Sequence, residues 1–323
     1  ECTDAASMLP LTRTSYIQRA TQGAALALKS RAALYAGSIA KYGEVGFGKL
    51  TGIDPSKADE YFAISYQASE DVLALPYYRL FRQDPDPTEN YRQLFLTKEN
   101  GEYIFQKTFD VASDIGNSYD KKHLPYSMCR WGSITPTLEM VEAYEMLDGT
   151  PGTFDTSVQH EDIYAMYQGR DPRMIASIYV PGQEFMDTTY QFQRGIIKSD
   201  GSVYIAQSAP GPTYADEFYT DAETGKTYRI LGKDGGAYTG DASKTGFNVR
   251  KFVDEDCAVQ AQWEFGKTET PWPIFRLGEI YLNLAEAAVE MGDHLDMALW
   301  AVNEIRDRAG MPDHKSIDLD KVR

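Results

Sequence analysis

The sequence predicts a mostly α-helical protein in which two helical hairpins flank a long, irregular region with short β-strands. In residues 15–76 and 272–312, apolar residues recur at steps of three and four, as on one face of an amphipathic helix. Between these segments, residues 150–270 are rich in Gly, Pro, Asp, Ser and Thr. We therefore expect one domain (1–323) made of a helical part (1–149), a loop-and-strand part (150–270) and a second helical hairpin (271–323).

The first hairpin begins with an Ala-rich segment of high helix propensity, residues 15–43. Leu28, Ala32, Tyr35 and Ile39 lie at helical steps and form an apolar stripe of the kind that faces a core. After a loop, Asp54 and Pro55 form an N-cap and N1 pair that starts a second helix, which ends before Pro76. Two hairpins of this size favour tetratricopeptide-like packing, although no continuous 34-residue repeat is present.

The middle of the chain predicts shorter elements. We expect helices at 90–98 and 136–147 and a strand at 102–109. Further short strands are expected at 174–180, 191–197, 203–207, 226–231 and 247–253. Long irregular regions are uncommon in compact proteins unless they have a function, so we place any ligand site on these loops, carried by a helical scaffold.

The second hairpin, residues 272–312, predicts two antiparallel helices joined by a tight turn. Its first helix has an apolar face formed by Leu277, Ile280, Leu284, Ala287 and Met291. Gly292 suits a left-handed C-cap, and Asp293 suits the N-cap of the next helix. Glu279, Glu286, Arg306 and Arg308 are expected to be solvated flanks with local ion pairs, and Trp272 and Trp300 to pack between helices.

Charge and motif content exclude several classes of function. The net charge of −16 argues against a nucleic-acid partner, because phosphate binding requires positive charge. The three cysteines have no metal-binding or redox spacing, and there is no apolar run of about 18 residues that could span a membrane. Metalloprotease, serine-hydrolase and nucleotide-binding motifs are absent from the sequence. We therefore expect no cofactor, no metal site and no catalytic residue.

Three strings of residues occur in an order typical of one family. The second hairpin contains R-x-x-E-x-x-L-x-x-A-E-A at 276–287 and N-x-I-R-x-R-A-G at 303–310. The first hairpin contains A-L-K-x-R-A-x-L-Y at 27–35, and Asp171-Pro172-Arg173 and Thr245-Gly246-Phe247 match shorter segments. The chain resembles the SusD/RagB family of glycan-binding lipoproteins of the Bacteroidetes outer membrane.

This resemblance implies a surface-exposed outer-membrane lipoprotein of a polysaccharide-utilisation system similar to the starch-utilisation system. Such a protein captures nutrient glycans for a SusC-like TonB-dependent transporter and breaks no bond. Both family ends are missing, so we expect an internal fragment whose lipid anchor, and part of whose glycan site, lie on residues outside this sequence.

Aromatic residues in polar loops are the candidate glycan contacts. Sugar rings stack their apolar C–H faces on aromatic side chains, and their hydroxyls form hydrogen bonds with Asn, Asp, Gln and Arg. The predicted ligand-binding residues are Trp131, Tyr190, Phe192, Tyr214, Tyr219, Tyr238 and Trp263. Two alternatives stay open: a glycoside hydrolase, which needs two carboxylates at a set separation, and a helical-repeat adaptor that binds proteins through an apolar groove.

Overall fold

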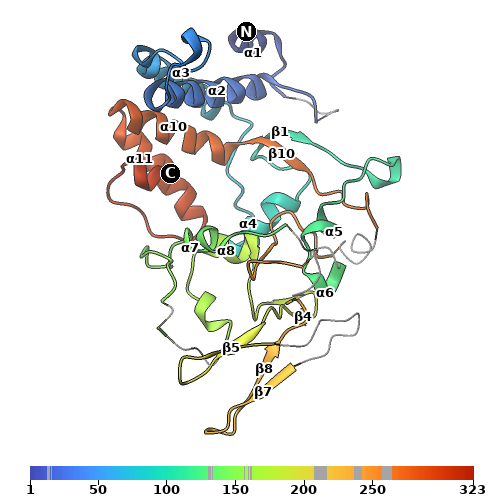
Figure 1. Ribbon diagram of the computed structural model, residues 1–323. Coiled ribbons are helices and arrows are strands. Elements are labelled where there is room, and N and C mark those ends of the chain that lie inside the picture. Colours follow the sequence, from blue (N-terminus) through green and yellow to red (C-terminus); the bar gives the residue numbers. More distant parts are fainter. Residues whose placement is uncertain are drawn as a thin grey trace. The chain divides into compact units, whose positions relative to one another are not determined.

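The computed structural model describes residues 1–12, 15, 17–129, 132, 134–155, 157–158, 160, 162–206, 217–235, 242–256 and 264–323. These residues group into two compact units (Figure 1). The helical unit comprises Glu1–Asn90, Thr97–Thr108 and Pro271–Arg323, and the loop unit comprises Tyr91–Leu96 and Phe109–Thr270. Residues 109–149, which we assigned to the N-terminal helical part, therefore group with the loop region instead.

The helical unit is built from helical hairpins, as predicted. Its elements are α1 (Cys2–Met8), α2 (Gln22–Tyr42), η1 (Phe47–Lys49), η2 (Pro55–Lys57), α3 (Ala58–Leu73), α10 (Leu277–Met291), α11 (Leu295–Arg308) and α12 (Leu319–Val322). Asp54 caps the segment that leads into α3 by accepting a hydrogen bond from Ser56 N (3.0 Å), and Pro55 follows it at N1. Helix α3 packs against both α2 and α10, and α10 packs against α11. The mostly α, tetratricopeptide-like fold class is confirmed.

The apolar stripe predicted for α2 faces outward. Leu28, Tyr35 and Ile39 are 47%, 65% and 45% exposed. The buried face instead carries small residues, with Gly37 against the ring of Phe62 on α3. Small side chains allow two helices to approach closely, so the residues of lower hydrophobicity occupy the interface between α2 and α3. Periodicity predicted the helix correctly and its buried face wrongly.

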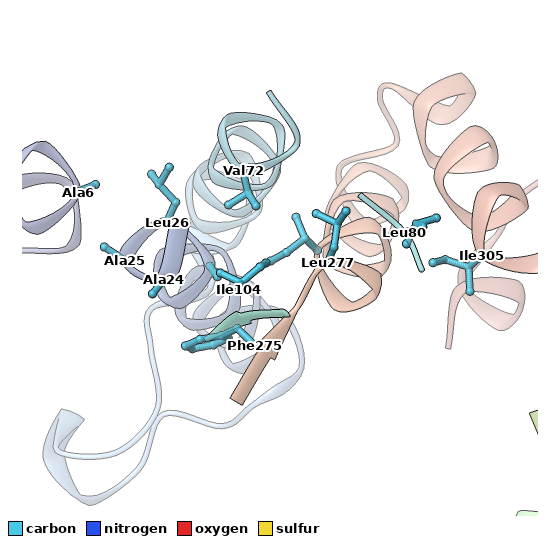
Figure 2. Close-up of a cluster of buried hydrophobic side chains, with 12 residues drawn as sticks. Ala6, Ala24, Ala25, Leu26, Val72, Leu80, Ile104, Phe275, Leu277 and Ile305 are labelled. Carbon is cyan, nitrogen blue, oxygen red and sulfur yellow. The ribbon is translucent and has the colours of Figure 1, made fainter. Parts of the chain in front are cut away.

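Figure 2 shows the core that joins these helices to a two-stranded sheet. Strand β1 (Tyr103–Lys107) pairs antiparallel with β10 (Trp272–Arg276), so that Tyr103 lies opposite Arg276 and Lys107 opposite Trp272. The buried side chains of this core include Leu26, Val72, Ile104, Phe275, Leu277 and Ile305 (Figure 2). The helix predicted from residue 272 is therefore wrong over its first five residues, whose backbone groups form the sheet and leave Trp272 at the surface.

The turn between α10 and α11 contains the predicted left-handed cap. Gly292 has φ +68°, and its N–H donates to the carbonyl of Val289 (3.1 Å). The N-cap of α11 is His294 rather than Asp293, and His294 itself has φ +53°. The imidazole of His294 is half-exposed and stacks on Tyr66 of α3 at 4.6 Å between ring centroids.

A buried ion cluster holds β1 to both helices of the second hairpin. The carboxylate of Glu102 accepts hydrogen bonds from Arg276 Nη1 (2.9 Å), Arg308 Nη1 (2.5 Å) and Phe81 N (2.8 Å). Burial alone would raise the pKa of Glu102, but Arg308 and Arg276 outweigh that cost and lower it. The expectation that Arg308 is solvated was therefore wrong. Glu279 likewise forms a two-bond ion pair with Arg31 on α2 (2.5 and 2.6 Å).

The loop unit contains short elements joined by long connections. Its helices are α5 (Tyr119–His123), α6 (Tyr126–Cys129), α7 (Leu138–Glu142) and α8 (Pro172–Ser177), with η3 (Val111–Ser113) and η4 (Ala165–Tyr167), and α4 (Pro87–Leu96) leads into it. Its two-stranded antiparallel sheets pair β2 (Ile178–Tyr179) with β9 (Asn248–Val249), β3 (Glu184–Phe185) with β4 (Thr188–Thr189), β5 (Gly195–Ile197) with β6 (Val203–Ile205) and β7 (Glu217–Thr220) with β8 (Thr227–Leu231).

Two predicted elements of this unit differ from those observed. The strand expected at 174–180 is mostly helix α8, because Asp171 accepts a hydrogen bond from Arg173 N (2.8 Å) and Pro172 occupies N1. The helix expected at 136–147 ends at Glu142. The residues that follow pair with another segment instead. Leu147 N donates to Gly169 O (2.8 Å), and Met146 forms an antiparallel bridge with Arg170.

Among the helices that the structure describes, none combines the length and the apolar character needed to cross a lipid bilayer.

Candidate functional site

Two β-hairpins of the loop unit lie beside each other (Figure 1), and three of their strands, β6, β7 and β8, each carry a tyrosine. In the hairpin of β7 and β8, Tyr219 lies directly opposite Tyr228. Residues paired in this way project from the same face of a two-stranded sheet. In the hairpin of β5 and β6, Tyr204 lies opposite Ile196, and its ring contacts the ring of Tyr219 at 5.7 Å between centroids. We call Tyr204, Tyr219 and Tyr228 the tyrosine platform.

Two rings of the platform, those of Tyr204 and Tyr219, rest on a small apolar core. Ile230 and Leu231 of β8 are buried beneath the hairpins, with Tyr204 and Tyr219 partly buried against them. Tyr228 is 39% exposed. A phenol ring with one face on the protein and an edge in solvent can offer an apolar surface and a hydroxyl at the same time. This arrangement suits a ligand that has both C–H faces and hydroxyl groups.

Two charged side chains lie close to the rings of the platform. Lys198 Nζ lies 5.6 Å from the ring centroid of Tyr204 and 5.4 Å from that of Tyr219. Tyr204 Oη lies 3.5 Å from Glu217 Oε1, at the limit of a hydrogen bond. The ammonium group can donate hydrogen bonds to a bound hydroxyl and the carboxylate can accept them. The platform therefore combines stacking surfaces with a donor and an acceptor.

The opposite face of the same hairpin carries a separate aromatic contact. Phe218 precedes Tyr219 in β7, and neighbouring strand residues point to opposite faces. Its ring is 54% exposed, and the Arg229 guanidinium lies 5.3 Å from its centroid. Phe218 is therefore an exposed aromatic residue of the same strand as Tyr219 that lies off the platform.

The predicted ligand-binding residues have different environments. Tyr219 is part of the platform. Trp131, Tyr214, Tyr238 and Trp263 lie outside the described residues, so their assignment stays a prediction.

Tyr190 is fully buried and packs against other aromatic rings. Its ring lies 6.5 Å from Phe185 and 6.3 Å from Phe192, and its hydroxyl donates to Asn248 Oδ1 (2.9 Å). Burial raises the pKa of Tyr190. These contacts favour a packing role for Tyr190, because protein groups already occupy its ring faces and its hydroxyl.

Phe192 is half-buried and packs on Gly246, where φ is +92° and an added Cβ would lie 3.3 Å from the ring.

Two platform residues, Tyr204 and Tyr228, were not among the sequence candidates. The selection favoured aromatics in polar loops, whereas both of these residues lie in short strands that had been predicted at 203–207 and 226–231. Because neighbouring strand residues point to opposite faces, alternation within the strand predicted at 226–231 would have placed Tyr228 and Arg229 on different faces. The pairing between hairpins that brings Tyr204 to Tyr219 has no signature in a single sequence.

Within the described part of the chain, no group of three or more His, Cys, Asp and Glu side chains is placed to hold a metal ion.

Comparison with known proteins identifies the family. The sequence model of the SusD family matches residues 100–321, which include β1, the loop unit from Phe109 onward, and the second hairpin. The chain belongs to the SusD family.

Solved structures of SusD-like proteins share its fold. A SusD-like protein from Bacteroides fragilis matches with 29% identity and a TM-score of 0.64, over 100% of this chain and 53% of that protein. A SusD-like carbohydrate-binding protein from the same species matches with 24% identity and a TM-score of 0.67, over 100% and 52%. A structure solved with a xylogluco-oligosaccharide matches with 17% identity and a TM-score of 0.59, over 99% and 50%.

The chain spans about half the length of the solved SusD-like structures that it matches. A search of curated proteins finds no match to this sequence.

The residues that resemble the SusD signature have structural contacts in this SusD-family chain. Arg276 and Arg308 hold the buried carboxylate of Glu102, and Glu279 binds Arg31. Arg306 Nε donates to the carbonyl of Pro312 (2.7 Å) and so closes the end of α11. The signature strings therefore build the helical unit, and the candidate ligand contacts lie elsewhere.

Proposed function

We propose that this chain is the carbohydrate-recognising part of a cell-surface SusD-family protein that binds nutrient glycans without cleaving them. The tyrosine platform carries this proposal. Tyr204, Tyr219 and Tyr228 supply aromatic surface on one face, and Lys198 and Glu217 supply a donor and an acceptor at its border. A pyranose ring needs this combination, since its C–H faces are apolar and its rim is covered with hydroxyls.

The names of the structural neighbours support the same ligand class. One neighbour is described as a carbohydrate-binding protein, and another was solved with a xylogluco-oligosaccharide. Their likeness to this chain, at 24% and 17% identity, establishes a shared fold. We extend their ligand class to this chain because the platform provides the matching chemistry.

We further propose that the protein is lipid-anchored at the outer membrane and delivers its glycan to a SusC-like TonB-dependent transporter. The outward face of α2 supports a contact with a protein partner. Leu28, Tyr35, Ile39 and Tyr42 form an exposed apolar stripe along this helix. Contiguous exposed apolar surface typically marks an interaction site.

Binding and turnover measurements on the same sample separate this proposal from the hydrolase alternative. The chain is titrated calorimetrically with a panel of neutral plant and bacterial oligosaccharides, and reducing ends are assayed after prolonged incubation. We expect saturable binding to at least one member of the panel and no release of reducing sugar. Release that is proportional to protein concentration would contradict the proposal, as would a failure to bind any glycan in the panel.

A further inference from the structure

A groove with a volume of about 430 Å³ lies on the helical unit, which does not contain the tyrosine platform. Its walls are formed by residues 78–83, by Gly101, by Tyr281 of α10 and by Glu304 of α11. An enclosed apolar cavity of about 150 Å³ admits a benzene-sized ring. The groove therefore has room for one six-membered ring or for two linked rings.

Two aromatic side chains of the second hairpin provide an apolar surface at this groove. Tyr281 lines it, and the ring of Tyr281 lies 5.2 Å from the ring of Trp300, measured between centroids. Trp300 precedes Glu304 by one turn of α11, so these two side chains lie on the same face of the helix. Trp300 is 40% exposed. An indole ring at the surface beside a groove can stack on the C–H face of a ligand.

Arg79 can supply hydrogen-bond donors to a ligand in the groove. Its backbone N–H donates to Gly101 O (3.0 Å), and its side chain lies against Gly101, where an added Cβ would be 3.0 Å from Cγ. Arg79 is exposed, and no hydrogen bond or ion pair engages its guanidinium in the part of the chain that the structure describes. The segment that carries it is fixed, because Leu80 is buried in the core of Figure 2 and Phe81 N donates to Glu102 (2.8 Å).

The charges at the groove balance, which favours a neutral ligand. Arg82 pairs with Glu304 (3.1 Å) and Asp307 (2.6 Å), so that with Arg79 there are two positive and two negative groups. Glu304 uses Oε2 in this pair, and among the described residues no donor engages Oε1. A carboxylate or phosphate ligand would meet Glu304 and Asp307, whereas hydroxyl groups can donate to Glu304 and accept from Arg79.

We propose that this groove is a second glycan site, which binds a neutral pyranose beside Trp300. The C–H face of the ring lies on Trp300 and Tyr281, one hydroxyl accepts from the Arg79 guanidinium, and another donates to Glu304 Oε1. The choice of a sugar rests on the proposed function, whereas the need for a neutral ligand with hydroxyls beside an apolar face follows from the groove itself.

The test follows the indole N–H signal of Trp300 by NMR in the whole chain, with Trp300→Phe used to assign that signal. The chain is titrated with the methyl glycosides of glucose, galactose, mannose and xylose, and with methyl glucuronide. We expect at least one neutral glycoside to shift the Trp300 signal saturably and the glucuronide to bind more weakly. Trp300 belongs to the helical unit, so its signal reports on the groove rather than on the tyrosine platform.

Arg79→Met removes the donors and is expected to weaken binding of the neutral glycoside about fivefold without lowering the melting temperature, because its guanidinium has no partner among the described residues. Lys315→Met is the matched control. It removes one exposed positive charge from the same unit without changing a lining residue, so it should bind as the natural chain does.

Three results would overturn the inference: no glycoside shifts the Trp300 signal, the glucuronide binds more tightly than the neutral glycosides, or Arg79→Met binds as tightly as Lys315→Met. In each case, oligosaccharide binding that depends on Tyr219 would still support the proposed function, so the two proposals fail separately.

Discussion

At the scale of single residues, the helical unit depends on a charge that is fully removed from water. Glu102 lies between Arg276 and Arg308 and also accepts from the backbone of Phe81. A buried pair of this kind gains little over apolar packing, but removing one partner leaves an uncompensated charge in the core. Arg308 is therefore a residue whose loss should damage the fold rather than the ligand site.

Arg308→Met is expected to destabilise the protein by roughly 2–3 kcal/mol, because the buried Glu102 carboxylate loses one of its two guanidinium partners and keeps only Arg276 and Phe81 N. Arg82→Met is the matched control. Arg82 also forms ion pairs from one side chain, with Glu304 (3.1 Å) and Asp307 (2.6 Å), but all three groups are exposed, so its loss should cost less than about 1 kcal/mol. Chemical denaturation of both variants measures the difference. Equal effects would show that burial of the ion cluster is unimportant.

Asp120 is a second buried carboxylate, and its burial disfavours the charged form. Its side chain is fully buried, and the hydrogen bonds that Thr268 and the backbone of Asp254 offer its carboxylate only partly offset the cost of burial. Burial raises the pKa of Asp120 to about 7. Between pH 4 and pH 7 the folded chain then holds a proton that the unfolded chain releases, so this group makes the protein less stable as pH rises through that window.

Asp120→Asn removes this ionisation. As pH rises from 5 to 8, the free energy of unfolding of the natural chain is expected to fall by roughly 2 kcal/mol relative to that of the variant. Denaturant titrations at pH 5 and pH 8 give the change in unfolding free energy with pH for each protein. The prediction concerns the difference between these two changes. If the two proteins show the same pH dependence, the carboxylate is solvated or paired in the folded state.

At the scale of elements, local signals were predictable and long-range pairings were not. Caps and turns such as Asp54-Pro55 and Gly292 were correctly located, because their geometry depends on neighbouring residues. Trp272–Arg276 was predicted to be helical, since nothing near it in sequence reveals its pairing with Tyr103–Lys107. Helix α8 was mistaken for a strand although Asp171-Pro172 supplied a readable start signal.

The candidate site shows the same difference between local signals, which were predictable, and long-range pairings, which were not. Tyr219 could be chosen as an aromatic in a polar region, but Tyr204 joins it only through packing between two hairpins. Tyr190 lies in an equally polar stretch and is fully buried, because Asn248 and the rings around it provide partners that sequence spacing does not show.

Helix α2 shows how small residues determine packing. A Cβ on Gly37 would lie 2.7 Å from the ring of Phe62, which is fully buried. Glycine to alanine inside a helix normally stabilises by about 1 kcal/mol, whereas overpacking a core costs about 1–3 kcal/mol. Gly37→Ala is therefore expected to destabilise the protein, as measured by thermal unfolding. Ser38→Ala, one position along the same helix, is expected to be neutral or slightly stabilising, and a stabilising Gly37→Ala would contradict the close packing of α2 on α3.

At the scale of the whole molecule, scaffold and recognition are assigned to different residues. The signature residues of the SusD family secure the helices of the helical unit through Glu102 and Arg31. The tyrosine platform belongs to the loop unit, and the apolar stripe of α2 belongs to the helical unit. This division explains why the most recognisable part of the sequence identifies the family without identifying the ligand.

The most direct measurement compares the affinities of Tyr219→Ala and Phe218→Ala for a glycan that the natural chain binds. The two residues are adjacent in β7 but lie on opposite faces of the hairpin. Loss of roughly 50 Å² of apolar contact on the platform predicts about tenfold weaker binding for Tyr219→Ala, or ~1.4 kcal/mol. Phe218→Ala should bind as the natural chain does. Unchanged affinity in Tyr219→Ala, or an equal loss in both variants, would contradict the assignment of glycan recognition to the tyrosine platform.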